Sequence, residues 1–231
     1  MHMRAFIVRM IAKRRAEIAS KDFVSKGDFM TNILTDDLFT EHEVYAIDEC
    51  ITFMLAGTAT TTLMISNSLY YLAADKEKGE KLRVDVSNFC KQTKPFKDFT
   101  EAEWKHFLLE EEAIMNCKYL SYCAAETLRR DPPLSHSTRL QITESVTIKG
   151  VTILKGQNLV VNMGYIHNRK DQWVEPDTYV PERFEPTSKY YLTPEGKKRH
   201  PLSYQPFLGG RRVCIGKTLA ENIGKCILAM I

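Results

Sequence analysis

The chain has 231 residues, and its 32 Lys and Arg against 29 Asp and Glu leave a formal net charge of +3. This near balance excludes an acidic tail and the strongly basic surface typical of nucleic-acid-binding proteins. With 44% hydrophobic residues, and only 11 glycines and 9 prolines, the composition also excludes a disordered or collagen-like chain and favours a globular protein.

The first nineteen residues are basic and amphipathic, with apolar Phe6, Ile7 and Ile11 among arginines and lysines. A transit peptide is one interpretation of this pattern. No small-residue cleavage site follows, however, and acidic Glu17 soon appears. We therefore expect a surface helix.

The 25 residues of Cys50–Ala74 carry no charge, and this length is sufficient to span a bilayer. The stretch nevertheless contains many hydroxyl side chains, among them Thr60, Thr61 and Ser68, which make it too polar for lipid. We expect instead a long helix through the middle of a core. The sequence T-E-H-E at Thr40–Glu43 is typical of a capping box, so the helix is predicted to begin there and to exceed thirty residues.

Two further helices are predicted before the helical patterns give way to strand-like ones. One covers Asp75–Val84. The next runs from about Trp104 to Arg130, with a break near Cys117. It ends there because Pro132 and Pro133 stop a helix.

Strands are predicted next. Residues 145–162 alternate apolar and polar positions and are rich in β-branched side chains. This pattern predicts a short hairpin that turns at Lys149 and Gly150, followed by a third strand near Leu159.

The remainder of the chain is predicted to be a meander and a helix. Residues 168–206 carry six prolines among charged and aromatic residues, which predicts an ordered but irregular segment. A final helix is predicted from about Gly216 to Ile231. The fold class expected from these elements is mainly α with a small β-sheet.

The cysteines indicate no disulfide scaffold. No two of them form a C-x-x-C pair, so neither a zinc ribbon nor a thioredoxin-like motif is expected. We expect them to be mostly reduced. The six are Cys50, Cys90, Cys117, Cys123, Cys214 and Cys226.

The glycine-rich segment Phe207–Thr218, F-L-G-G-R-R-V-C-I-G-K-T, allows two interpretations. A phosphate-binding P-loop needs a glycine five positions before the Gly-Lys-Thr triplet, where this chain has Arg211, and no predicted strand precedes the loop. The other interpretation is a soft-metal site with Cys214 as a lone thiolate. Gly210 and Gly216 would let the backbone lie against a planar ligand, while the helix N-terminus and the nearby arginines favour the anion.

Four motifs occur in order along the chain. They are A-G-T-A-T-T at 56–61, E-T-L-R at 126–129, P-E-R-F at 181–184 and F-x-x-G-x-R-x-C-x-G at 207–216. Together they resemble the oxygen-activating helix, the E-x-x-R motif, the P-E-R-F motif and the haem-ligand loop of the cytochrome P450 family. The resemblance covers about Thr40–Ile231.

The resemblance implies the C-terminal part of the cytochrome P450 fold, truncated at both ends. A long central helix, a proline-rich meander and a haem-ligand loop belong to that part. We expect residues 1–231 to be one incomplete domain. On its own, such a fragment is expected to pack loosely, to bind haem weakly and to lack turnover.

The cofactor that the resemblance implies is haem, an iron protoporphyrin, with Cys214 as the axial thiolate and metal ligand. Phe207 would shield the sulfur from water, and Arg212 would pair with a haem propionate. Arg139, ten residues after Arg129, lies where the family commonly has a second propionate-binding arginine; the alternative is an exposed charge at a strand end. The implied cofactor-binding set is Arg139, Phe207, Gly210, Arg212, Cys214 and Gly216.

The resemblance also implies a buried charge triad of Glu126, Arg129 and Arg183. Its role would be structural, since it would fix the side of the fold that carries the haem loop. An exposed ion pair between Glu126 and Arg129, three residues apart on one helix, is the alternative.

Thr60 and Thr61 are the catalytic residues that the resemblance implies. Threonines in a helix can bond to their own helix carbonyls and open a groove, where dioxygen would be organised over the haem. The position before that threonine is commonly acidic in the family, whereas this chain has Ala59, which cannot relay a proton.

The implied function is a haem-thiolate monooxygenase that inserts one atom of dioxygen into a small lipophilic substrate, with electrons from a reductase or a ferredoxin. Nucleic acid is not an expected partner. The alternatives are an oxygen-independent haem-thiolate isomerase or dehydratase, which Ala59 favours, and an inactive remnant. Full-length family members are often bound to the endoplasmic-reticulum membrane; we expect no anchor within this chain, and membrane contact only through segments outside it.

Overall fold

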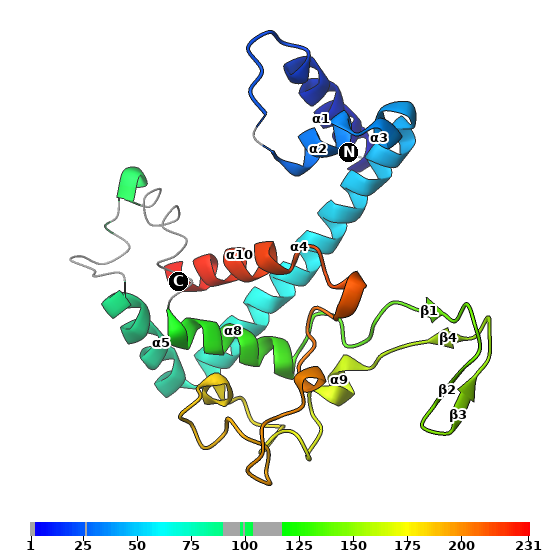
Figure 1. Ribbon diagram of the computed structural model, residues 1–231. Helices are drawn as coiled ribbons and strands as arrows, with labels where there is room; N and C mark the ends of the chain where they lie inside the picture. Colours follow the sequence, from blue (N-terminus) through cyan, green and yellow to red (C-terminus); the bar gives the residue numbers. More distant parts are fainter. Residues whose placement is uncertain (1–2, 26, 90–97, 99, 104–116) are drawn as a thin grey trace. The chain divides into compact units, whose positions relative to one another are not determined.

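The computed structural model describes residues 3–25, 27–89, 98, 100–103 and 117–231. These residues are mostly helical, with two small antiparallel strand pairs, which confirms the expected fold class (Figure 1). The chain divides into two compact units, residues 1–59 and 60–231. That it forms one incomplete domain stays a prediction.

The regular elements described in the first unit are all helices. This unit contains α1 (Met3–Ile18), α2 (Phe29–Thr35), α3 (Asp37–Glu41) and the first part of α4 (Glu43–Ala74). The expected N-terminal helix is confirmed, because one apolar face of α1 is buried in the core of this unit. That core consists of Ile7, Ile11, Ile33, Leu34, Ala46, Ile47 and Cys50.

The long helix α4 has 32 residues, as expected, but it begins at Glu43. The predicted capping box is wrong, because Thr40 lies inside α3 and its Oγ1 donates to the Asp37 carbonyl at 2.9 Å. Asp36 starts this short separate helix by accepting the Leu38 amide at 3.0 Å. An aspartate cap of this kind satisfies a free amide, so a short helix is stabilised from Asp37 and the threonine lies within it.

Within the described ranges, no helix combines the length and the apolar character needed to cross a membrane.

The second unit is built around α8 (Lys118–Arg130), which packs against α5 (Lys76–Phe89), α10 (Lys217–Met230) and the 3-10 helix η2 (Pro181–Phe184) (Figure 1). Helix α5 extends beyond its predicted end at Val84. Of the predicted helix from Trp104, residues 104–116 lie outside the described residues. The core here consists of Leu72, Leu82, Val86, Cys117, Tyr119, Leu120, Cys123, Leu228 and Ala229.

The predicted hairpin is confirmed as β2 (Val146–Ile148) paired with β3 (Val151–Ile153). Its turn residues, Lys149 and Gly150, have φ values of 47° and 81°, the left-handed pair that a two-residue hairpin turn requires. The third predicted strand does not join this hairpin.

That third strand, β4 (Asn158–Leu159), pairs instead with β1 (Leu140–Gln141), which the sequence did not predict. The hydrogen bonds beside this pair explain the choice. The Ile142 amide donates to the Gln157 carbonyl at 2.9 Å, and the Gly156 amide donates to the Ile142 carbonyl at 2.8 Å. These bonds turn the chain back beside β1.

The meander is irregular, as predicted, and contains the 3-10 helices η2 and η3 (Pro201–Ser203). The short helix α9 (Met163–Ile166) lies just before it. Trp173 is only 1% exposed. The Arg199 guanidinium lies 4.4 Å from the centre of that indole ring, so a cation and an aromatic ring help to hold the segment together. The final helix, α10, is confirmed.

Candidate functional site

A closed loop, Phe207–Gly216, joins the meander to α10. Its backbone passes through two left-handed residues, Leu208 with φ 61° and Gly210 with φ 69°. The 3-10 helix η4 (Gly210–Arg212) follows, and the Cys214 amide donates to the Phe207 carbonyl at 3.0 Å. Glycine adopts the left-handed conformation without strain, so Gly210 suits this turn. The loop follows η3 rather than a strand, which removes the structural context of a P-loop.

Cys214 presents a free thiol at the start of α10. The residue is exposed, and its carbonyl accepts the Lys217 amide at 3.3 Å. A Cβ atom at Gly216 would lie 3.8 Å from Cys214 Sγ, an ordinary van der Waals contact. Residue 216 therefore lies directly beside the thiol, and glycine places no side-chain atom there.

The surroundings of Cys214 are apolar and basic. Val213, Ile215 and Leu219 are 47%, 82% and 65% exposed, and Arg211 and Arg212 are exposed as well. Contiguous exposed apolar patches mark binding surfaces, and these three side chains lie within seven residues of sequence. The residues present fit haem, because a flat apolar ring with anionic propionates and a thiolate-seeking iron complements such a surface.

Phe207 anchors the loop in the core of the second unit. Its side chain packs against Met64 on α4 and against Ala124 and Leu128 on α8. Helix α10 also approaches Met64, since a Cβ atom at Gly224 would lie 3.0 Å from Met64 Cε. The loop is therefore held against both helices from its first residue.

Thr60 and Thr61 lie on α4, one helical turn before Met64, and both are partly buried. Ala59, just before them, is exposed. Arg139 directly precedes β1 and is exposed, and it makes no ion pair within the described residues. Thr60 and Thr61 thus lie on the same helix as Met64, against whose cluster Phe207 packs, whereas no contact among the described residues brings Arg139 to the loop.

Glu126, Arg129 and Arg183 are brought together in the interior. All three side chains have zero exposure. Arg129 Nε and Nη2 each donate to one oxygen of Glu126 at 2.8 Å, a bidentate arrangement, and Arg183 Nε donates to Glu126 Oε1 at 3.0 Å. The exposed ion pair considered for Glu126 and Arg129 is therefore excluded.

One carboxylate faces two guanidinium groups in the triad, and backbone carbonyls solvate the excess positive charge by accepting hydrogen bonds. Arg129 also donates to the carbonyls of His167 and Pro176, both at 2.9 Å. Arg183 donates to the Thr178 carbonyl at 3.0 Å. These bonds satisfy the buried donors and tie α8 to the meander.

The structure reveals a buried residue that the sequence did not indicate, His167. Its ring Nε2 accepts the Gln205 amide at 2.8 Å, while its carbonyl accepts Arg129. Burial, together with the positive charge of Arg129, lowers the pKa of His167 to about 4, so the ring is neutral near pH 7. Gln205 is 38 residues further along the chain, and no local pattern in the sequence links the two residues.

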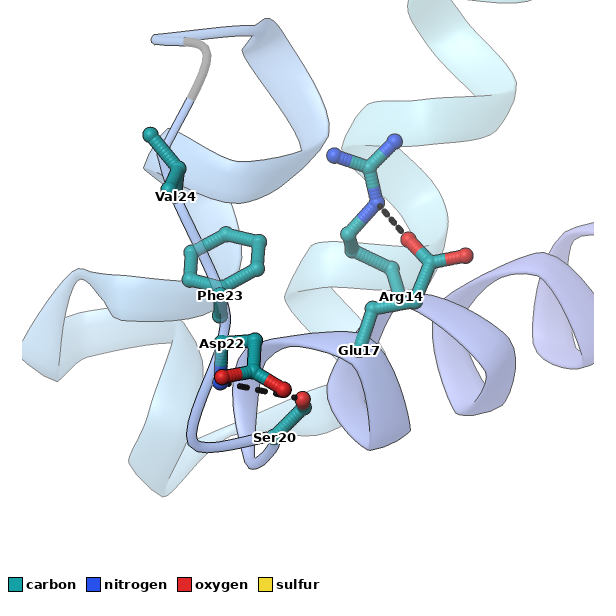
Figure 2. Close-up of a pocket in the computed structure, with 6 residues that line it drawn as sticks. All are labelled: Arg14, Glu17, Ser20, Asp22, Phe23 and Val24. Carbon is teal, nitrogen blue, oxygen red and sulfur yellow. Dashed lines mark hydrogen bonds and ion pairs between the residues drawn. The ribbon is translucent and has the colours of Figure 1, made fainter.

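A separate depression of about 320 Å³ lies in the first unit (Figure 2). Figure 2 shows the Arg14 guanidinium bonded to Glu17 beside Phe23. Arg14 also pairs with Asp28 at 2.5 Å. None of the predicted site residues lines this depression, and its one cation is already paired, so we assign it no function.

Comparison with known proteins gives consistent matches. The family model described as Cytochrome P450 matches residues 1–231. The chain is 32% identical over 182 residues to Cytochrome P450 4F4 of Rattus norvegicus, covering 79% of this chain and 31% of that protein. It is also 32% identical over 182 residues to Cytochrome P450 4F2 of Homo sapiens, covering 79% and 32%.

The fold is similar to the crystal structure of a cytochrome P450 (CYP102L1), with a TM-score of 0.77 and 24% sequence identity. This match covers 99% of the present chain and 47% of that one. The present chain thus matches about a third of the length of the curated relatives and about half of the solved structure.

Proposed function

Since the chain belongs to the cytochrome P450 family, we propose that Cys214 is the thiolate ligand of a haem iron in a monooxygenase. The observation that carries the proposal is the exposed Cys214 thiol, held in a closed loop among exposed apolar and basic side chains. The reaction inserts one atom of dioxygen into a lipophilic organic substrate. The other atom leaves as water, with two electrons from a redox partner and two protons.

The residues of the loop have distinct proposed tasks. When bound, haem supplies the iron at which dioxygen is reduced, and a thiolate ligand assists cleavage of the O–O bond. Phe207, whose ring packs against Met64, Ala124 and Leu128, is proposed to exclude water from the sulfur. Gly210 and Gly216 allow the backbone to approach a flat ligand. Arg212, which is exposed, pairs with a propionate, and Arg139 is proposed for the second propionate.

Thr60 and Thr61 are proposed to position dioxygen and water on α4. A hydroxyl in a helix can donate to a carbonyl of the preceding turn and accept from a water molecule. Ala59 offers no proton. Proton delivery is therefore assigned to water held by the two threonines.

Glu126, Arg129 and Arg183 are proposed to act structurally. They connect α8 with the meander, and the meander leads directly into the loop that holds Cys214. None of the three is proposed to touch the substrate or the haem.

A reductase or a ferredoxin is proposed as the electron donor and a small lipophilic compound as the substrate. The near-neutral charge of the chain supports the absence of a nucleic-acid partner. The family's frequent location at the endoplasmic-reticulum membrane is proposed for the whole protein.

Ala59 favours a second candidate, an oxygen-independent haem-thiolate isomerase or dehydratase, because such a reaction needs no proton delivery to dioxygen. An inactive remnant is the third candidate.

The deciding experiment records the absorption spectrum of the reduced, haem-loaded protein with carbon monoxide and then follows product formation. Product that requires a reductant supports the monooxygenase, peroxide substrates consumed without a reductant support the second candidate, and a thiolate-type spectrum without turnover supports the third. A spectrum that lacks the thiolate type contradicts the proposal.

A further inference from the structure

We propose that His167 is a positioning residue that couples the buried triad to the loop of Cys214. The inference rests on the proposed role of Cys214 as haem ligand. It concerns a buried ring that belongs to none of the motifs in the sequence.

His167 makes one hydrogen bond to the triad and one to the segment that leads into the loop of Cys214. Its backbone carbonyl accepts Arg129 Nη1 at 2.9 Å, which joins it to the triad. Its ring Nε2 accepts the Gln205 amide at 2.8 Å, which joins it to the residue two positions before Phe207. A single residue thus spans the distance from α8 to the beginning of the loop.

The position of the loop depends on that of Gln205. The Gln205 carbonyl accepts the Leu208 amide at 3.1 Å, and the Phe207 carbonyl accepts the Cys214 amide at 3.0 Å. These bonds link the amide held by His167 to the backbone of Cys214 in two steps. A shift of Gln205 would therefore be transmitted to the residue that carries the thiol.

The His167 ring is fixed in orientation. It has zero exposure, and its centre lies 5.5 Å from that of the Tyr204 ring. The Tyr204 hydroxyl donates to the Ala125 carbonyl at 3.1 Å, which holds the neighbouring ring against α8. Because Nε2 accepts a hydrogen bond, the ring proton is assigned to Nδ1, which has no partner within the described residues.

An apolar replacement removes the acceptor and leaves the partly buried Gln205 amide without its partner, a cost that the backbone can relieve by shifting toward water. Glutamine is the conservative replacement, since its side-chain oxygen reaches about as far as the imidazole Nε2. Asparagine is one methylene shorter, so its oxygen cannot reach the Gln205 amide.

The experiment measures amide hydrogen exchange across residues 204–214 in the protein as its natural gene encodes it. In H167L, the exchange rates of the Gln205, Leu208 and Cys214 amides should rise about tenfold or more, the effect of losing one hydrogen bond. In H167Q they should remain close to those of the unaltered protein. The same ordering is expected for the fraction of thiolate-type carbon monoxide spectrum in the haem-loaded protein.

H200L is the matched control. The His200 ring also accepts a backbone amide, that of Leu202 at 3.1 Å, but it is exposed and contacts neither Arg129 nor Gln205 in the described residues. Its loss should leave exchange across the loop and the spectrum unchanged.

Should H167L fail to fold, the comparison of H167Q with H167N decides the matter, because the two variants differ in reach and not in chemistry. Protection of the Gln205 amide in H167Q and its loss in H167N support the proposal. Equal exchange in these two variants overturns it, as does unchanged exchange in a folded H167L. A missing thiolate spectrum in the unaltered protein contradicts the haem function alone, since the exchange measurement tests the coupling without haem.

Discussion

Glu126 and Arg183, 57 residues apart in the sequence, form an ion pair of 3.0 Å between two side chains that are both fully buried. A buried ion pair adds little net stability, yet removing one partner strands the other charge. Arg129 shares the same carboxylate. The stability of the meander on α8 therefore depends on Glu126 more than on either arginine.

The variant E126Q should lower the free energy of unfolding by about 3–5 kcal/mol, because two buried guanidinium groups lose their counter-charge. Chemical denaturation measures the effect. Glu80 and Arg83 provide the matched control, since they form the same i,i+3 pair at 2.6 Å on an exposed helix surface. E80Q should unfold like the unaltered protein, because exposed pairs contribute little. An equal decrease in the free energy of unfolding in E126Q and E80Q would show that burial does not increase the contribution of the triad to stability.

The variant C214S should lose the thiolate-type carbon monoxide spectrum of the reduced, haem-loaded protein. A hydroxyl is a harder and much less acidic donor than a thiol, so it does not replace the thiolate on iron. Replacing Cys50, Cys90, Cys117, Cys123 or Cys226 by serine should leave the spectrum intact in whichever of these variants folds. Retention of the thiolate-type spectrum in C214S would exclude Cys214 as the ligand.

His167 should make the stability of the protein depend on pH between about 6.5 and 4. In this range the unfolded chain binds a proton on the imidazole, whereas burial and Arg129 keep the folded ring neutral until its pKa of about 4. Stability from this residue is therefore complete above pH 6.5 and is lost as the pH falls, by about 3 kcal/mol in all.

Denaturation curves at a series of pH values test this expectation, with H167Q as the comparison, because glutamine does not titrate. Between pH 6.5 and 4, the free energy of unfolding should change less steeply with pH in H167Q than in the unaltered protein. Asp28, whose pKa is lowered to about 2 by bonds from Thr31 and Arg14, loses its contribution only below this window. Identical pH dependence in the two proteins would mean that His167 titrates normally.

The variant A59D should raise the fraction of reducing equivalents recovered in product and lower peroxide release. A carboxylate beside Thr60 would provide the proton donor that the alanine lacks. The measurement compares reductant consumed, product formed and peroxide released in the active protein. A59N serves as the control, since it adds similar bulk without an ionisable group. Unchanged coupling in A59D would show that water held by the threonines already delivers the protons.

The sequence by itself determined the elements and motifs whose causes are local. The Lys149-Gly150 turn predicted its hairpin because two adjacent residues supply the left-handed backbone that such a turn needs. The uncharged stretch predicted most of α4, and the prolines predicted both the end of α8 and the irregular meander. The motif around Cys214 indicated the family, because it is long and its spacing is fixed.

Tertiary structure decided what depends on residues far apart in the chain. It paired β4 with β1 instead of the hairpin, and it gave His167 the Gln205 amide as its partner. It also surrounded both guanidinium groups of the triad with backbone carbonyls that accept their hydrogen bonds. Hydrophobic periodicity is a property of one segment, whereas each of these contacts arises only when packing brings two segments together and buried polar groups must find partners.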